Sequence, residues 1–306
     1  QPFYSENINQ LTAPNYDGFP LDLYLSPEPV LPVQFSRGCY YKDCAFCALT
    51  LDHQNFRQRD PGKTVDDLVW LKERYGAQSF FFTDECFALS PTKRLCQQMI
   101  DRQVNVKWTC ELRFEKNLSR ELLTQMRDAG CLKIVFGLES FNQRVMDFMK
   151  KGIKQESVRR IVDDCVDLGI AVHCYVIVGF PTEKEEEALE TMNFVVGNTK
   201  LHESYGFSCQ PCLFDLEKEA PIMSDPGSYG IRRIMRPATE DLSLGFFYEV
   251  QEGMTPAQAE QLYQQVYEKI SEVVCELPFN YSMADGLLYI ARAKSQALQI
   301  PQPTVS

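Results

Sequence analysis

Residues 171–178 read Ala-Val-His-Cys-Tyr-Val-Ile-Val, an apolar run with the length and the β-branched content of a buried strand. Amphipathic, helix-like stretches flank this run, one at 155–168 that stops at Gly169 and one at 183–196. Short apolar runs that alternate with helices indicate parallel strands joined by right-handed crossovers. This unit therefore predicts an α/β fold.

The same alternation extends over residues 33–215. The strand candidates are Val33–Ser36, Ser79–Thr83, Val106–Cys110, Lys133–Gly137, Ala171–Val178 and Gly206–Phe214. Six units are too few for an eight-stranded barrel, so we expect a partial (β/α)6 TIM-like barrel. Proline-rich residues 1–32 are expected to form a linker that wraps the core. Residues 216–306 are expected to form a loop and a mainly helical C-terminal extension, with helices at 255–275 and 283–297.

Charge and cysteine content narrow the class of protein. The chain of 306 residues has a formal net charge of −11, which disfavours a nucleic-acid-binding surface. No apolar stretch is long enough to cross a membrane. Most of the 12 cysteines stand alone among apolar residues, where a free thiol behaves as a small hydrophobe, so we expect a reducing cytoplasm. The opening Gln-Pro-Phe, without Met, suggests a fragment of a longer protein.

Cys39, Cys44 and Cys47 form the strongest local signal, because three thiols fall within nine residues directly after the first expected strand. Loops at the carboxyl ends of barrel strands form the active-site face. Three thiolates on a 4Fe–4S cluster leave one iron open to another ligand, which is where chemistry can occur. A structural zinc site completed by His53 and a set of ordinary core cysteines are the alternatives.

This loop resembles the cluster-binding motif of the radical S-adenosylmethionine (SAM) superfamily, Cys-x3-Cys-x2-Cys with an aromatic residue before the last cysteine. The sequence departs from that motif by one residue, since four residues separate Cys39 from Cys44. The resemblance spans roughly residues 30–215 and implies an enzyme that reductively cleaves SAM to a 5′-deoxyadenosyl radical. It also implies an electron donor such as flavodoxin or ferredoxin.

The resemblance carries SAM-binding roles to residues at the ends of the expected strands. Asp84 or Glu85 would accept from the SAM ammonium group, although Asp84 could instead cap the next turn. Arg113 resembles the arginine near the SAM carboxylate, and an ordinary salt bridge is its alternative. The further positions are Glu139 and Ser140 at the ribose, and Ile177 and Gly179 at the adenine.

Two later features stay open at this point. Strand alternation places His173 and Tyr175 on the same face as Ile177, toward the barrel interior, where a buried, hydrogen-bonded histidine is the commoner outcome. Cys209 and Cys212 form a Cys-x2-Cys pair, but on a strand their thiols would point to opposite faces.

Residues 20–32 and 214–222 resemble the barrel domain of cobalamin-binding-domain radical SAM proteins. That resemblance implies methylation or another radical modification of a small-molecule or peptide substrate, with cobalamin bound by a domain not present in this chain. One alternative is a cobalamin-independent radical SAM enzyme, such as a methylthiotransferase or peptide-modifying enzyme. The other is a non-catalytic Fe–S or zinc protein. The substrate is not specified by any motif.

Overall fold

A six-stranded sheet forms the centre of the molecule in the computed structural model, which describes residues 6–24, 28–48, 55–197, 207–236 and 245–273. The strand order is β1-β4-β5-β6-β7-β8, and every neighbouring pair is parallel. The strands are β1 (Val30–Val33), β4 (Ser79–Phe82), β5 (Lys107–Leu112), β6 (Cys131–Glu139), β7 (Ala171–Val178) and β8 (Phe207–Leu213). Within the described residues β1 and β8 are edge strands, so the sheet is an open partial barrel, as the six units predict.

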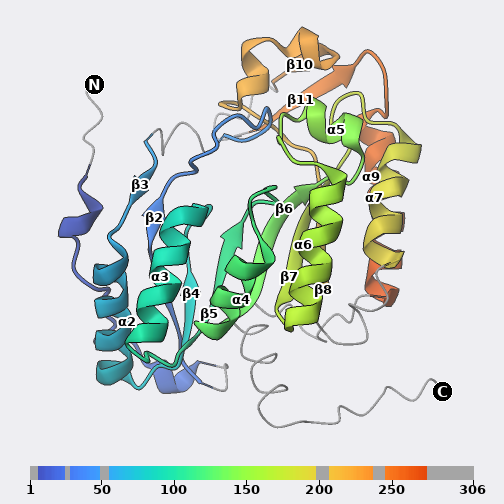
Figure 1. Ribbon diagram of the computed structural model, residues 1–306. Coiled ribbons are helices and arrows are strands. Elements are labelled where there is room, and N and C mark those ends of the chain that lie inside the picture. Colours follow the sequence, from blue (N-terminus) through green and yellow to red (C-terminus); the bar gives the residue numbers. More distant parts are fainter. Residues whose placement is uncertain (1–5, 25–27, 49–54, 198–206, 237–244, 274–306) are drawn as a thin grey trace.

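Helices cover the outer side of this sheet (Figure 1). They are α2 (Pro61–Tyr75), α3 (Leu89–Asp101), α4 (Arg120–Asp128), α6 (Gln155–Leu168) and α7 (Glu185–Gly197), whereas the short α5 (Gln143–Phe148) lies at the upper edge of the sheet in Figure 1. Asp60 caps α2 by accepting from the Lys63 amide, and Pro61 occupies its first position. Gly169 ends α6 in the left-handed conformation that glycine adopts at low cost, as the sequence predicts.

The two faces of the sheet differ in character. Alternate residues, among them Phe80, Trp108, Phe136 and Cys174, pack under the helices in the main hydrophobic core. The opposite face is the interior of the partial barrel, here called the lumen. Strand register places His173 opposite Ser208 and Tyr175 opposite Gln210 on that face, which confirms the alternation predicted for β7.

The first strand lies three residues earlier than expected, inside the stretch predicted to be a linker. Val30 pairs with Ser79, and the strand ends at Val33. The chain then turns, because the amides of Phe35 and Ser36 both donate to the Asp84 carboxylate. Ser36–Arg37 (β2) pairs antiparallel with Arg57–Gln58 (β3) and leads into the cysteine loop.

The segment that precedes β1 packs along α2. It contains two 3-10 turns, η1 (Ile8–Gln10) and η2 (Leu21–Leu23). The Tyr16 ring contacts the Tyr75 ring edge-on, and Arg59 donates to the carbonyl of Leu11 at 2.9 Å. Over its described part, this segment is therefore held against α2 and Arg59.

The extension after β8 contains a small sheet that the sequence did not reveal. Its strands β9 (Leu216–Glu217), β10 (Ile231–Met235) and β11 (Gly245–Val250) are antiparallel in the order β10-β11-β9. Two 3-10 turns, η3 (Pro221–Ser224) and η4 (Pro226–Tyr229), precede β10. The helix expected at 255–275 forms as α9 (Pro256–Val273), packed on α7 and β8. The helix expected at 283–297 lies outside the described residues.

The hydrophobicity of the helices bears on membrane insertion. Over the described part of the chain, none of them combines the length and the apolar character that a bilayer-spanning helix needs.

Candidate active site

The cysteine loop lies at the carboxyl edge of the sheet, and the chain on both sides holds its midpoint. The Ala45 amide donates to the carbonyl of Met149 at 2.9 Å, at the end of α5, and the Ala45 carbonyl accepts from the Ile222 amide at 2.8 Å. Ala45 also belongs to a second hydrophobic core that includes Ile177 and Phe180. Figure 1 shows the blue chain reaching across the upper edge of the sheet toward α5 and β11.

The three loop thiols sit in different surroundings. Cys44 is buried, and Nη1 of Arg113 lies 3.7 Å from its sulfur. Cys39 is partly buried, and a hydrogen bond from the Cys86 thiol lowers the pKa of Cys39 to about 5. As the described residues stand, no three histidine, cysteine or carboxylate side chains converge into a group that could hold a metal ion. His53, the zinc ligand of the alternative hypothesis, lies outside the described residues.

Asp84 and Glu85 both hold the backbone that leads into the cysteine loop. The Asp84 carboxylate is buried and accepts from the amides of Phe35 and Ser36 and from the Ser36 hydroxyl. Burial raises the pKa of Asp84 to about 7, against the lowering effect of these hydrogen bonds. Glu85 accepts from the Gly38 amide at 2.9 Å, directly before Cys39. The Asp84 carboxylate is therefore occupied by the backbone that enters the loop, and the Glu85 carboxylate contacts the amide of the residue next to Cys39.

Arg113 connects the cysteine loop to β5 and to the turn after α5. Its guanidinium stacks on the Tyr41 ring, 3.4 Å from the ring centroid, and donates to the carbonyl of Lys151. The carboxylate of Glu115 lies 3.7 Å from its Nε. The side chain is buried, so the surface salt bridge considered as an alternative does not describe it. A positive charge beside Cys44 suits a sulfur that becomes negative on binding a metal cluster.

Glu139 pairs with a residue that sequence reasoning missed. Nζ of Lys151 lies 3.1 Å from its carboxylate, and both side chains are buried. Burial lowers the pKa of Lys151, but the Glu139 carboxylate raises it further, so the net shift is upward. Glu139 has a φ of 62°, which turns its side chain back at the end of β6. Lys151 Nζ also lies 5.7 Å from the centroid of Phe46, the aromatic residue of the cysteine motif.

The other residues expected to contact SAM lie either on the lumen face of the sheet or in the packing between helices. Ile177 packs in the second core beside Ala45. Ser140 is fully buried, and its hydroxyl bonds to Thr191 at 3.2 Å and accepts from the Asn142 amide. Ser140 therefore joins α5 to α7. A Cβ at Gly179 would collide with Ala259, so this glycine is required for the packing of α9.

Glu183 lies in the turn between β7 and α7. Its carboxylate is buried and accepts from the Gly179 amide at 2.7 Å. Burial raises the pKa of Glu183 to about 8. Glu183 therefore shapes the turn after β7 from within.

The Cys-x2-Cys pair is split between the faces of β8, as expected. Cys209 packs against the main core, and Cys212 is exposed opposite Ile177. Two thiols on opposite faces of one strand cannot bind one metal ion together.

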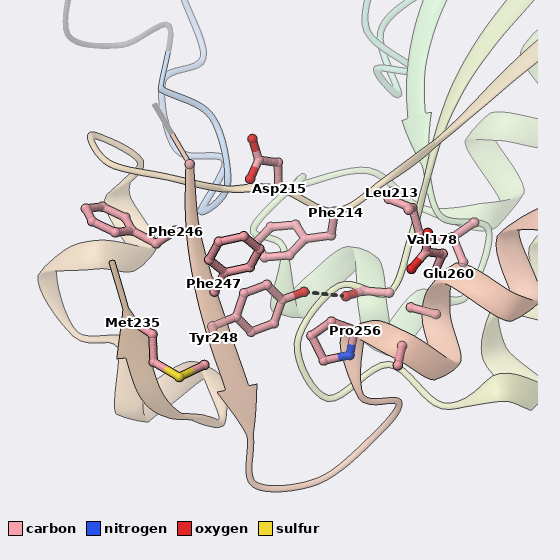
Figure 2. Close-up of a pocket in the computed structure, with 14 residues that line it drawn as sticks. Val178, Leu213, Phe214, Asp215, Met235, Phe246, Phe247, Tyr248, Pro256 and Glu260 are labelled. Atoms are coloured by element: carbon pink, nitrogen blue, oxygen red, sulfur yellow. Dashed lines mark hydrogen bonds between the residues drawn. The ribbon is translucent and has the colours of Figure 1, made fainter. Parts of the chain in front are cut away.

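A cavity of about 790 Å³ lies where β8 meets α9 and β11 (Figure 2). Aromatic side chains line it, namely Phe214, Phe246, Phe247 and Tyr248. The Tyr248 hydroxyl donates to the carbonyl of Gly179 at 3.4 Å. Figure 2 shows Asp215 and Glu260 on opposite sides of the cavity. Of the site residues expected from the sequence, only Gly179 contributes to its lining.

The cysteine loop, the parallel sheet and the helices that follow its strands match one protein family. The model of the radical SAM superfamily covers residues 33–195, more than half of the chain. The chain belongs to the radical SAM superfamily. It is an enzyme of that class, and the family implies a 4Fe–4S cluster and SAM as its cofactors.

Curated relatives of this radical SAM chain include methyltransferases and a cyclase. An uncharacterized methyltransferase of Pyrococcus horikoshii is 28% identical over 193 residues, which are 62% of this chain and 42% of that protein. The anaerobic magnesium-protoporphyrin IX monomethyl ester cyclase of Rubrivivax gelatinosus is 31% identical over 160 residues, 51% of this chain and 29% of that protein. The chain thus spans less than half the length of these relatives.

Solved structures share the fold. The radical SAM methyltransferase TsrM of Kitasatospora setae, determined with cobalamin and a 4Fe–4S cluster, superposes with a TM-score of 0.54 at 19% identity, over 76% of this chain and 46% of its own. The cobalamin-dependent radical SAM enzyme OxsB, with aqua-cobalamin and SAM bound, gives a TM-score of 0.60 at 16% identity, over 77% of this chain and 40% of its own.

The kinds of donor present suit the cofactors that the family implies, although the three thiols do not converge in the described structure. Three thiols occupy one backbone-anchored loop, and a buried guanidinium lies against one of them. Three thiolates suit a cluster that keeps one iron for another ligand. Glu85 and Glu139 supply acceptors at the same edge of the sheet.

Proposed function

We propose that this chain is the catalytic barrel of a radical SAM enzyme that modifies a carbon centre, methylation foremost, with Cys39, Cys44 and Cys47 as the cluster ligands. The observation that carries this proposal is the anchored loop, in which Ala45 is bonded on both sides and Arg113 lies against the Cys44 sulfur. When bound, the cluster supplies the electron that cleaves SAM to methionine and a 5′-deoxyadenosyl radical. Every other task falls to the residues of the chain.

The carboxylates at the sheet edge have separate tasks in this proposal. Glu85 accepts from the SAM ammonium group, while Asp84 holds the loop backbone and acts as a positioning residue. Glu139 accepts from the ribose hydroxyls, and Lys151 fixes the orientation of its carboxylate. The Arg113 guanidinium, held flat on Tyr41, faces the SAM carboxylate.

The adenine and its surroundings involve β7 in this proposal. Ile177 offers an apolar surface to the base on the lumen side of the strand. The family resemblance gave Gly179 and Ser140 contacts with SAM. In the structure Gly179 allows α9 to pack closely, and Ser140 joins two helices. Both are proposed to position the strand ends rather than to touch SAM.

Methylation with cobalamin is the finer part of the proposal. Several curated relatives bear methyltransferase names, and the structures of TsrM and OxsB contain cobalamin. The chain spans less than half of those proteins, so we assign cobalamin binding to a domain outside it. A cobalamin-independent radical reaction is the second candidate, and the cyclase relatives favour it.

Anaerobic reconstitution with iron and sulfide tests the catalytic core. The loaded chain should show a broad absorbance that dithionite bleaches, and it should form 5′-deoxyadenosine from SAM. Cys44→Ala should lose both signals, whereas Cys212→Ser, a matched change at an exposed thiol outside the loop, should keep them. Circular dichroism checks that both variants fold. A full 4Fe–4S signal in Cys44→Ala, or wild-type chain that forms no 5′-deoxyadenosine, would refute the proposal.

The full-length protein tests the methylation step. It should bind added aquacobalamin with a change in its visible spectrum, and the chain alone should not. A full-length protein that forms 5′-deoxyadenosine yet binds no cobalamin would favour the cobalamin-independent candidate.

A further inference from the structure

Three neighbouring strands place polar side chains on the floor of the lumen, at the amino end of the sheet. Thr109 on β5 is the register partner of Lys133 on β6. His173 on β7 lies one row nearer the carboxyl edge, since Lys133 pairs with Ala171 and Val135 pairs with His173. Side chains of paired residues point to the same face, so these three line one part of the lumen.

These side chains are buried, and each has a polar atom without a hydrogen-bond partner in the described ranges. Their residues are 0%, 6% and 8% exposed for Thr109, Lys133 and His173, respectively. The Thr109 Oγ1 and His173 Nε2 atoms have no hydrogen-bond partner among the described residues. Lys133 Nζ likewise makes no hydrogen bond or ion pair within the described ranges. Buried polar groups are nearly always paired, so three together without partners indicate a missing ligand.

The electrostatics of these groups agree with that view. Burial lowers the pKa of Lys133 to about 8. Burial and the nearby Lys133 charge lower the pKa of His173 to about 3, so the imidazole is neutral at physiological pH. The Ser208 hydroxyl lies 2.7 Å from His173 Nδ1. When that hydroxyl donates to Nδ1, the proton lies on Nε2 and that atom can donate into the lumen.

The charge along the lumen changes sign from floor to edge. Glu111 faces the lumen one row above Thr109, in the same row as His173, and burial, with Glu85, Glu139 and Asp84 adding to it, raises its pKa to about 7. The acidic side chains thus begin at the row of His173 and continue to the edge, which suits the SAM cation, whereas the row below carries the ammonium of Lys133. Lys107, the other cation at the floor, is partly exposed and lies 3.9 Å from the Glu28 carboxylate. An anion in the lumen would therefore settle against Lys133 rather than against the edge.

We propose that Thr109, Lys133 and His173 bind the carboxylate of the substrate, which makes the substrate an organic acid. This rests on the proposed function, since it places the reacting carbon of that acid toward the cysteine loop. Lys133 and Glu139 are six residues apart on β6. At about 3.3 Å per residue their levels along the strand differ by about 20 Å, so the floor lies well apart from the edge at which SAM is proposed to bind. The carboxylate is held at the end of the substrate remote from the radical chemistry.

Binding of matched probes to the reconstituted holoenzyme with SAM tests this site. The probes are 3-phenylpropionate, the uncharged 3-phenylpropionamide and inorganic phosphate, followed by saturation-transfer NMR. The wild type should bind the acid at least tenfold more tightly than the amide. Lys133→Met should abolish that preference and Lys133→Arg should keep part of it. Lys107→Met, which removes a neighbouring lysine outside the site, should leave the preference unchanged.

Two results would overturn the assignment. One is equal binding of acid and amide by the wild type, or an acid preference that survives Lys133→Met. The other is displacement of the acid by phosphate at equal affinity, which would make the floor an inorganic oxyanion site. The thermal midpoint of Lys133→Met supplies a check on folding, because removal of a buried charge without a partner should leave the midpoint equal or higher. A lower midpoint would show a structural role for Lys133 and would also refute the proposal.

Failure here and failure of the catalytic proposal remain distinguishable. Acid binding is measured without turnover, and 5′-deoxyadenosine formation is measured in the same wild-type preparation without substrate. Acid preference without 5′-deoxyadenosine would refute the catalytic role alone. 5′-Deoxyadenosine without acid preference would refute the carboxylate site alone.

Discussion

The carboxyl edge of the sheet and the floor of its lumen both bury polar side chains, but the two regions differ in how many of these groups have partners in the described part of the chain. At the edge, Asp84 accepts three hydrogen bonds from the chain that precedes the cysteines, and Glu139 pairs with Lys151. At the floor, Lys133 and its neighbour Thr109 find no partner in the described part of the chain. Polar groups that the chain satisfies by itself shape the site, whereas groups left without partners are available to a ligand.

Breaking the ion pair between Lys151 and Glu139 at the sheet edge should have the largest effect on stability. Lys151→Met leaves the buried Glu139 carboxylate without its partner, and breaking a buried ion pair from one side costs about 3–5 kcal/mol of unfolding free energy. Urea denaturation measures the loss. The double variant Lys151→Met with Glu139→Leu removes both charges and should recover most of it. Equal stability of the single variant and the wild type would show that the pair is not buried in solution.

Removing the Asp84 carboxylate should have the next largest effect. Asp84→Ala leaves the buried amides of Phe35 and Ser36 without an acceptor, at about 2–4 kcal/mol in total. The loop entry should loosen, so iron incorporation per chain should fall as well. Asp84→Asn keeps one acceptor oxygen and should lose less in both measurements. Full iron content in Asp84→Ala would show that Asp84 is not needed to hold the cysteine loop for iron binding.

A methyl group at Gly179 tests whether α9 supports the edge. Gly179 has a φ of 85°, and the added Cβ would collide with Ala259. Strained backbone and overpacking together should cost about 2–3 kcal/mol of unfolding free energy. Gly18→Ala has a similar φ of 85° with open space around it, so it isolates the backbone contribution. Equal losses in the two variants would show that α9 does not pack there.

Replacing Lys133 at the floor should change the free energy of unfolding least, and it should stabilise the protein rather than destabilise it. The pKa of Lys133 is about 8 in the folded chain, below its ordinary 10.5, so the unfolded chain binds more protons between these values. The contribution of Lys133 to the free energy of unfolding of the wild type therefore rises with pH in that window, by at most about 1.4 kcal/mol per pH unit. The advantage of Lys133→Met over the wild type should shrink by about 1 kcal/mol from pH 8 to pH 9, because Lys133 in the folded chain is still about half protonated at pH 8. A pH-independent difference in denaturation midpoints would contradict it.

The barrel could be predicted because each strand is an apolar run bounded by a helix signal. β7 (171–178) coincides with the predicted run to the residue. The strand β1 begins three residues before its predicted start. Pro32 interrupts its apolar pattern, and Phe35 continues that pattern past the turn. The small sheet of the extension escaped prediction because β9 is only two residues long and has no periodicity to detect.

The site was predictable in its residue types but not in its pairings. The cysteine spacing and the acids at strand ends are visible in the sequence, whereas the contact between Glu139 and Lys151 depends on a φ of 62° at Glu139. Lys150 and Lys151 are adjacent residues of the same type, yet only Lys151 is buried. The partners of Asp84 lie 48 and 49 residues away, across the sheet, where no local rule reaches.

The hydrogen bond between the Ala45 carbonyl and the Ile222 amide has a consequence for biosynthesis. Ile222 leaves the ribosome about 180 residues after Ala45, which is about 10–35 seconds later at 5–20 residues per second. During that interval the nascent chain presents three thiols on a loop that lacks its hydrogen bond to Ile222, and until Met149 has been made the loop lacks its hydrogen bond to that residue as well. Iron–sulfur assembly on this protein is therefore expected to finish after translation has passed residue 222, and the unfastened loop is most open to oxidation before then.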